Sequence, residues 1–182
     1  MHIPVRHRAA RFYLAVCATA AALLGTPAAL ATWSIVIADS ETKEVAVGTV
    51  TCLNNYDLLA IVPVVVVGKG AAACQASGDF DGQRRPIIFQ QLRLGTPPDQ
   101  ILQMLAAISG HSSRQYGIAD TQDRMLTYTG PNCYQWAGGV VGRQGTMVYA
   151  IQGNILAGGC VVPAIERAVL DTPGDIPAKL MA

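Results

Sequence analysis

The first 31 residues determine how much of this chain can belong to a folded domain. Three arginines precede an apolar run from Phe12 to Leu24, and the small-residue sequence Ala29-Leu30-Ala31 follows it. A basic start, a short apolar segment and small residues before the cleavage point are the three parts of a secretory signal peptide. We therefore predict a signal peptide over residues 1–31, cleavage after Ala31, and one domain over residues 32–182.

A membrane anchor is the competing interpretation of the same segment. A spanning helix needs ~20 apolar residues, whereas this run is shorter and is followed by Gly25 and Pro27. We expect an exported protein, periplasmic or extracellular, with no stable membrane span after cleavage.

The charge of the remaining domain argues against nucleic-acid binding. Removal of the three leader arginines lowers the count of Lys and Arg from 13 to ten, against 12 Asp and Glu. The mature domain then has a net charge near −2 and shows no basic stripe of the kind that binds phosphates. We predict no nucleic-acid partner.

Four cysteines remain after the leader is removed: Cys52, Cys74, Cys133 and Cys160. An even number in an oxidising compartment predicts up to two disulfides, and the sequence leaves all three pairings open. Free buried thiols are the alternative. A zinc site is disfavoured because the domain has no C-x-x-C pair and only one histidine, so we predict no metal and no cofactor.

Alternating and β-branched segments predict strands, and two polar connections predict hairpins. The predicted strands are Thr32–Ala38, Val45–Thr51, Ile61–Val67, Ala71–Ala76, Gln115–Ala119, Met125–Thr129 and Thr146–Gln152. The apolar run Ile61–Val67 has no alternation and predicts a strand buried on both faces, with Pro63 at its start or at a bulge.

Three helices are predicted from periodicity and end signals. Pro86–Leu94 ends at Gly95, and Thr96-Pro97-Pro98-Asp99 begins the next helix with an N-cap and an N1 proline. That helix has an apolar face, as does Val161–Leu170 near the end of the chain. Strands and helices thus occur in segregated runs, which favours an α+β fold with antiparallel sheets.

Several familiar catalytic motifs are missing from the sequence. There is no G-x-S-x-G, no H-E-x-x-H and no P-loop. A Ser-His-Asp triad in the mature domain would have to use His111, and a solvated loop histidine is the stronger interpretation.

Thr32 is a candidate nucleophile that needs no histidine. Cleavage after Ala31 would give this residue both a hydroxyl and a free α-amine. An α-amine has a pKa of about 8, so a useful fraction is neutral near pH 7 and can accept the hydroxyl proton. The alternative is that an exported protein must begin with some residue, and threonine is common.

The mature sequence resembles the bacterial domain-of-unknown-function 1028 family, which is placed with the N-terminal-nucleophile (Ntn) hydrolase fold. Many relatives begin Met-Thr or Met-Ser, so removal of Met exposes a hydroxyl residue where signal cleavage would do so here. The matching segments are Thr32–Val47 (TWSIVIADSETKEVAV), Thr51-Cys52, Gly70–Ala76, Arg114–Ile118, Thr129–Gly138 and Gln152–Gly158.

The resemblance implies a four-layer αββα sandwich and, by analogy, amide hydrolysis by Thr32. Gln75 and Asn154, each near the end of a strand, become candidates to bind the oxyanion or the substrate; ordinary structural amides are the alternative. Relatives continue into a further helix and a Gly-Gly-Asp-x-Arg segment, so we expect a chain shortened at its C-terminus.

Three hypotheses for function follow. The first is an exported threonine amidohydrolase acting on small amides or peptides. The second is a non-catalytic exported domain of the same fold that binds a ligand or peptide, and the third is a disulfide-stabilised structural domain. Fold alone does not separate them.

Overall fold

The computed structural model describes residues 31–181. The leader predicted for residues 1–31 therefore lies outside the described residues, except for Ala31. The strands are β1 (Thr32–Asp39), β2 (Val45–Thr51), β3 (Pro63–Val66), β4 (Gly70–Gln75), β5 (Gln115–Asp120), β6 (Met125–Thr129), β7 (Gly138–Gln144) and β8 (Met147–Asn154). The helices are α2 (Leu58–Ile61), α3 (Arg84–Leu94), α4 (Pro98–Ala106), α5 (Val161–Asp171) and α6 (Ile176–Leu180), with a 3₁₀ turn η1 (His111–Ser113).

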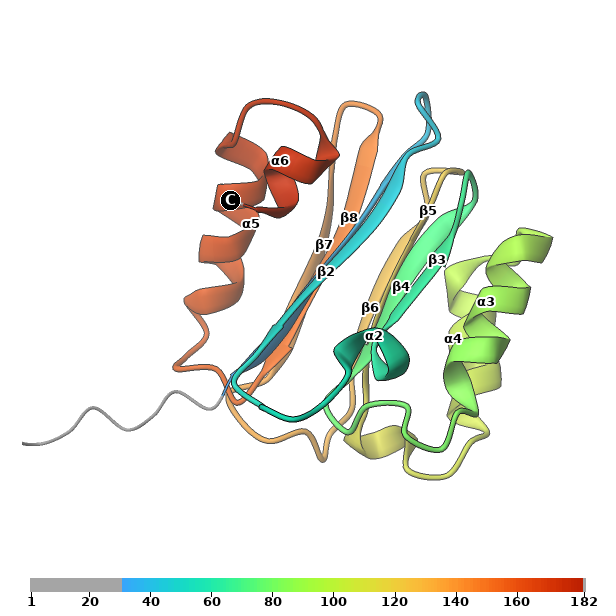
Figure 1. Cartoon of the computed structure of the whole chain (residues 1–182), viewed down its shortest axis with the longest axis vertical. Helices are drawn as coiled ribbons and strands as arrows, with labels where there is room; N and C mark the ends of the chain where they lie inside the picture. The colour runs from blue at the N-terminus through green and yellow to red at the C-terminus, as the bar shows by residue number, and fades with distance from the viewer. Residues whose placement is uncertain (1–30, 182) are drawn as a thin grey trace, which may run out of the picture.

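The strands form two four-stranded sheets with the orders β2-β1-β8-β7 and β3-β4-β5-β6. The pairings within both sheets are antiparallel, as expected for hairpin-connected strands. The sheets lie face to face, with α3 and α4 outside one and α5 and α6 outside the other (Figure 1). The predicted α+β class with antiparallel sheets is confirmed.

The central strands of each sheet, β1 and β8 in one and β4 and β5 in the other, bury both of their faces, and strand alternation separates the two sets of side chains. On β1, Ile35 and Ile37 pack in the layer beneath α5 and α6. Val36 and Ala38 point the other way, into an apolar cluster between the sheets. A third cluster fills the space between the second sheet and helices α3 and α4.

The strand predictions are confirmed except at two places. The first is β7, which the sequence analysis did not predict. Its segment GGVVGRQ contains glycines, which lower strand propensity. At two of these positions a glycine is required because a neighbouring side chain occupies the space of a Cβ atom. A Cβ on Gly139 would lie 2.5 Å from Thr127 Oγ1, and one on Gly142 would overlap the Tyr149 hydroxyl.

The second difference is β3, which is an edge strand rather than a strand buried on both faces. Val65 is 42% exposed, whereas Val64 and Val66 are buried. The first residue of the predicted strand, Ile61, belongs instead to the short helix α2, whose N-cap Asp57 accepts a hydrogen bond from Leu59 N–H. Pro63 begins β3 as predicted, where its missing N–H removes little from the ladder.

The helix predictions are confirmed; α5 begins at Val161 as predicted, whereas the starts of α3 and α4 are shifted. Helix α3 begins two residues earlier, at Arg84, and ends at Gly95 in the left-handed conformation (φ 78°). Helix α4 is capped by Pro97 with Pro98 at N1, one residue later than predicted. The reason is that Thr96 Oγ1 donates to Gln91 Oε1 at 2.7 Å and therefore ties Thr96 to the preceding helix.

No helix within residues 31–181 has the length and apolar character required to cross a membrane. In the same range, no cluster of three or more His, Cys, Asp or Glu side chains is placed to hold a metal ion.

Candidate functional site

Thr32, Gln75 and Asn154 lie at one end of the space between the two sheets. Thr32 begins β1 and pairs with Thr51 on β2 and with Asn154 on β8. Its hydroxyl lies 2.8 Å from the Thr51 hydroxyl. The sequence therefore identified three residues that the fold brings together, although the β1–β8 pairing joins positions 122 residues apart.

A hydrogen-bonded network of buried polar side chains forms the floor beneath Thr32. Ser34, two residues along the same face of β1, donates to Gln75 Oε1 and lies 3.0 Å from Thr49 Oγ1. Gln75 Nε2 in turn donates to Gln115 Oε1 at 2.9 Å. The Gln75 amide is thus engaged at both ends and links the two sheets.

Gln115 is the centre of this network. Its Oε1 also accepts a hydrogen bond from Asn154 Nδ2 at 2.9 Å. Its Nε2 donates to Thr129 Oγ1 at 2.9 Å and to Gly153 O at 2.8 Å. One side chain thereby joins β4, β6 and β8, and it is fully buried. Networks satisfied to this extent rigidify the residues they hold.

Gln152 is the exception among these buried amides. Neither its Oε1 nor its Nε2 has a hydrogen-bond partner within residues 31–181. The amide lies against Gly117 of the opposite sheet, where a Cβ would overlap it. Gly117 is therefore required by the close approach of a side chain rather than by its own backbone conformation.

A pocket of about 140 Å³ opens beside Thr32. It is lined by Thr32, Thr51, Leu53, Tyr56, Leu58, Ile61, Val62, Gln75, Ala76, Ser77, Gly78 and Phe80. The Tyr56 and Phe80 rings meet edge to face at its rim, with centroids 5.6 Å apart. Asn154 lies outside this lining and faces a neighbouring cavity of similar volume.

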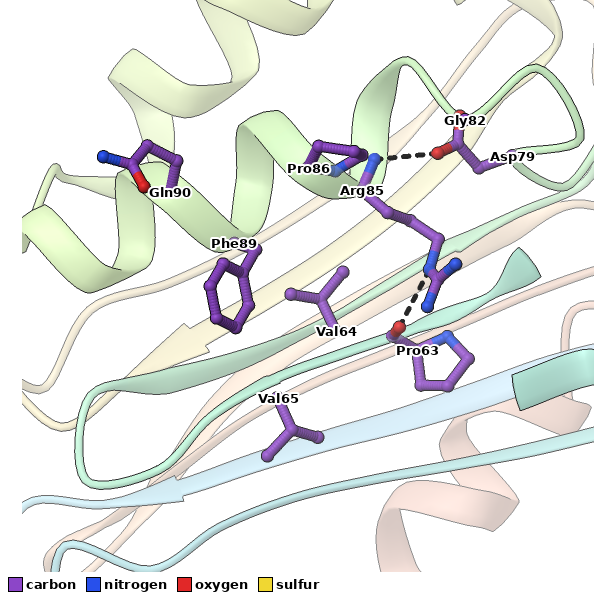
Figure 2. Close-up of a pocket in the computed structure, with 9 residues that line it drawn as sticks. All are labelled: Pro63, Val64, Val65, Asp79, Gly82, Arg85, Pro86, Phe89 and Gln90. Atoms are coloured by element: carbon purple, nitrogen blue, oxygen red, sulfur yellow. Dashed lines mark hydrogen bonds between the residues drawn. The ribbon is translucent and has the colours of Figure 1, made fainter. Parts of the chain in front are cut away.

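A larger cavity, about 560 Å³, lies between β3 and α3 (Figure 2). Its charged groups are Asp79 and Arg85. The Asp79 carboxylate accepts the Arg85 backbone N–H at 2.8 Å, and Arg85 Nε donates to Pro63 O at 3.0 Å. These groups are occupied in fixing the start of α3, and no hydroxyl or thiol lines the cavity. Size alone does not make it the better candidate.

His111 lies in a stack of rings rather than in a solvated loop. Its imidazole stacks on Tyr128 with centroids 4.2 Å apart and on Tyr116 at 5.7 Å. Burial and the nearby charge of Arg84 lower the pKa of His111. Partial burial and stacking explain the difference from the sequence interpretation, and nothing in these contacts links His111 to Thr32.

All four cysteines of the described chain are free, so the predicted disulfides are not present in the structure. Cys74 faces the apolar layer beneath α3 and α4. Cys160 precedes α5 on the far side of both sheets and is exposed, as is Cys52. Cys133 is buried near Arg114, whose carbonyl oxygen its thiol contacts at 3.4 Å. Cys74 and Cys133 are therefore the buried free thiols that the sequence left as the alternative.

Sequence reasoning missed Ser34, Thr51 and Gln115 as members of the site. A signal was present for Ser34 and Gln115. Ser34 follows Thr32 at the two-residue strand period, and Gln115 precedes the small residues Gly117 and Ala119 on the inward face of β5. Small residues beside a large inward amide indicate that the opposite sheet approaches closely.

Comparison with known proteins gives a family and a fold. Residues 32–182 match a family described as a family of unknown function, DUF1028. A crystal structure of a protein from Silicibacter pomeroyi, assigned to the same family, superposes with a TM-score of 0.71 at 22% identity. The match covers 83% of this chain and 67% of that one, and at this identity it concerns the fold. No curated protein matches the chain. The chain therefore belongs, over residues 32–182, to the DUF1028 family.

Proposed function

We propose that this protein is an exported amidohydrolase whose nucleophile is Thr32, acting on small amides or peptides. The observation that carries the proposal is the position of Thr32. It is the first residue of β1, its hydroxyl contacts a second hydroxyl at 2.8 Å, and it lines a pocket. A signal peptidase that cuts after Ala31 would make this residue the N-terminus.

The layer order supports the same proposal by analogy. Helices, two antiparallel sheets and helices again follow one another (Figure 1), which is the arrangement that the Ntn-hydrolase resemblance implies. In that arrangement the nucleophile begins a strand at the end of the sandwich, where Thr32 lies. Fold analogy raises the expectation of hydrolysis, and the chemistry rests on Thr32 itself.

The proposed reaction has two steps. The α-amine of Thr32 accepts the proton of Oγ1, which attacks the amide carbonyl carbon and forms a tetrahedral intermediate. The C–N bond breaks, the leaving amine takes the proton from the Thr32 ammonium, and an ester on Oγ1 remains. Water, deprotonated by the same amine, then hydrolyses the ester to a carboxylic acid and restores Thr32. The amine must be neutral, so the rate rises with pH up to about 8.

The backbone N–H of Cys52 is the donor we assign to the oxyanion. In the chain that still carries Ala31, this N–H donates to Ala31 O at 3.0 Å. Cleavage removes that carbonyl and leaves the N–H free beside Thr32, where a substrate carbonyl can replace it. Gln75 and Asn154, whose amides bind Gln115, hold the floor of the site in this proposal.

N-terminal sequencing of the secreted protein is the first test. The expected first residue is Thr32. A β-lactone probe, which acylates nucleophilic hydroxyls, should then label Thr32 Oγ1 as an ester. Thr32→Ala should abolish labelling with an unchanged unfolding transition, because the residue begins a strand and is only partly buried.

A matched control separates the amine from the hydroxyl. A form that retains Ala31 before Thr32 keeps the fold and the hydroxyl but has no free amine at Thr32. It should label at least a hundredfold more slowly, because it lacks the general base and because Ala31 O still accepts the Cys52 N–H that would bind the oxyanion. Equal labelling of the two forms would remove the amine from the mechanism. Failure of the processed protein to label would favour the non-catalytic binding domain.

A further inference from the structure

The walls of the Thr32 pocket contain no charged side chain. Apart from the hydroxyls of Thr32, Thr51 and Ser77 and the amide of Gln75, its lining is apolar or aromatic. A pocket of this composition desolvates whatever enters it, and a charged acyl group there would lose its hydration without gaining a charged side-chain partner. The α-amine of Thr32, the ionisable group that cleavage would add, is neutral in the reactive form. The pocket therefore selects against ligands whose bound group is charged.

The rim of the pocket exposes large apolar side chains to solvent. Leu53, Tyr56 and Phe80 are 54%, 52% and 61% exposed. They come from two different connections, the one after β2 and the one after β4, and they converge on a single opening. Clustered exposed apolar side chains around a concave site are typical of ligand binding.

The volume of the pocket limits the size of the group that fits. A cavity of about 150 Å³ lined by apolar side chains holds one benzene molecule, and this pocket measures about 140 Å³. One phenyl ring or one branched aliphatic group fills it. A longer group would extend past the Tyr56–Phe80 pair into solvent.

We propose that the Thr32 site selects amides whose acyl group is small, uncharged and apolar. This inference rests on the proposed function for its chemical step, and the pocket determines which acyl group reaches Oγ1. Tyr56 and Phe80 are the specificity-determining residues. Burial of their exposed rings against the acyl group stabilises the bound substrate.

The experiment varies the acyl group at a constant leaving amine. The processed protein is given 7-amino-4-methylcoumarin amides carrying phenylacetyl, 3-methylbutanoyl, succinyl or glycyl groups. We expect kcat/KM for the two apolar substrates to exceed that for the anionic and cationic ones by about a hundredfold or more. Equal rates across the series, or a preference for succinyl or glycyl, would overturn the inference while leaving the hydrolase intact.

Phe80→Lys tests the pocket directly, and Phe89→Lys is its matched control. Phe89 is also an exposed phenylalanine, 44% exposed, but it lines the other cavity (Figure 2). Phe80→Lys should lower kcat/KM for phenylacetyl about tenfold and raise it for succinyl. Phe89→Lys should change neither value. Equal effects of the two variants would show that the pocket does not determine the preference.

A binding measurement separates this inference from the hydrolase proposal. Thr32→Ala keeps the other residues that line the pocket but lacks the nucleophile. Phenylacetamide should shift NMR signals from Tyr56 and Phe80 in this variant, whereas succinamate at the same concentration should not. Binding of phenylacetamide without turnover by the processed protein supports the pocket and rejects the hydrolase. Turnover of apolar amides without this binding pattern rejects the pocket.

Discussion

The two ends of the space between the sheets differ in chemistry although the same strands form both. At one end Val36, Ala38 and Val148 pack with alanines of β4, β5 and β8. At the other end, two to four residues along the same strand faces, lie Ser34, Gln75, Gln115, Gln152 and Asn154, all buried. One strand such as β4 thus changes from Ala71 and Ala73 to Gln75 on a single face.

The two ends also contribute differently to stability. Apolar burial stabilises the first end, at about 25 cal/mol for each Å² removed from water. At the second end, buried amides contribute little net stability even when bonded and cost much when they are not. Under the proposed function, this polar network would hold the strand ends that surround Thr32.

The rate of thiol modification tests whether water enters the apolar layer that contains Cys74. The difference in rate between this buried cysteine and the exposed ones should be the largest of the predicted effects. Burial, with the nearby charge of Asp79, raises the pKa of Cys74 from 9.0 to about 12. Its thiolate fraction at pH 8 is then about a thousandfold below that of an ordinary thiol. Iodoacetamide should modify the exposed Cys52 and Cys160 rapidly, and Cys74 only after unfolding, as measured by peptide mass spectrometry. Burial also raises the pKa of Cys133, which should react slowly. Rapid labelling of Cys74 in the folded protein would show that this layer admits water.

Gln115→Met should cause the largest loss of stability at the polar end. The substitution keeps the length of the side chain but removes the bonds that Gln75, Asn154, Thr129 and Gly153 O make with Gln115. We expect the free energy of unfolding to fall by about 4 kcal/mol, measured in urea. The exposed Gln90→Met on α3 is the control and should change it by less than about 0.5 kcal/mol. A similar small change for Gln115→Met would show that the network is dispensable.

Val148→Thr introduces a hydroxyl at the apolar end, where Val148 is fully buried in the apolar cluster between the sheets. We expect a loss of about 2 kcal/mol in the free energy of unfolding, since the hydroxyl is buried without a hydrogen bond. Val141→Thr on β7, where the side chain is 40% exposed, is the matched control and should be nearly neutral. If both variants lose the same stability, the two ends do not differ in polarity as the structure indicates.

Thr129→Val removes one bond from the polar end and should have the smallest effect. Gln115 Nε2 loses its bond to Thr129 Oγ1 but keeps the bond to Gly153 O. A loss of about 1 kcal/mol is expected in the same urea titration. A loss as large as that of Gln115→Met would mean that the hydroxyl, rather than the Gln115 amide, organises the network.

The sequence by itself determined the elements that depend on local pattern. The β1–β2 and β5–β6 hairpins and the helical faces of α4 and α5 follow from two-residue or 3.6-residue periods and short end signals. Thr32 became the candidate nucleophile through the predicted cleavage site and the family resemblance. The edge position of β3 and the glycine-containing β7 were not accessible in this way. Both depend on the neighbouring strands: β3 pairs with β4 on one side and with no strand on the other, whereas Gly139 on β7 lies against Thr127 and β8.

Only the tertiary structure decided how the site is built. The amide network joins residues about 40 positions apart in the chain, such as Ser34 with Gln75 and Gln115 with Asn154. The pocket at Thr32 takes its walls from two connections that meet only in the fold. Of the cysteines, Cys74 and Cys160 cannot pair because the fold places them on opposite sides of the sheets. Local periodicity specifies which face of a strand is buried, but the partners across a buried face are set by the packing of distant segments.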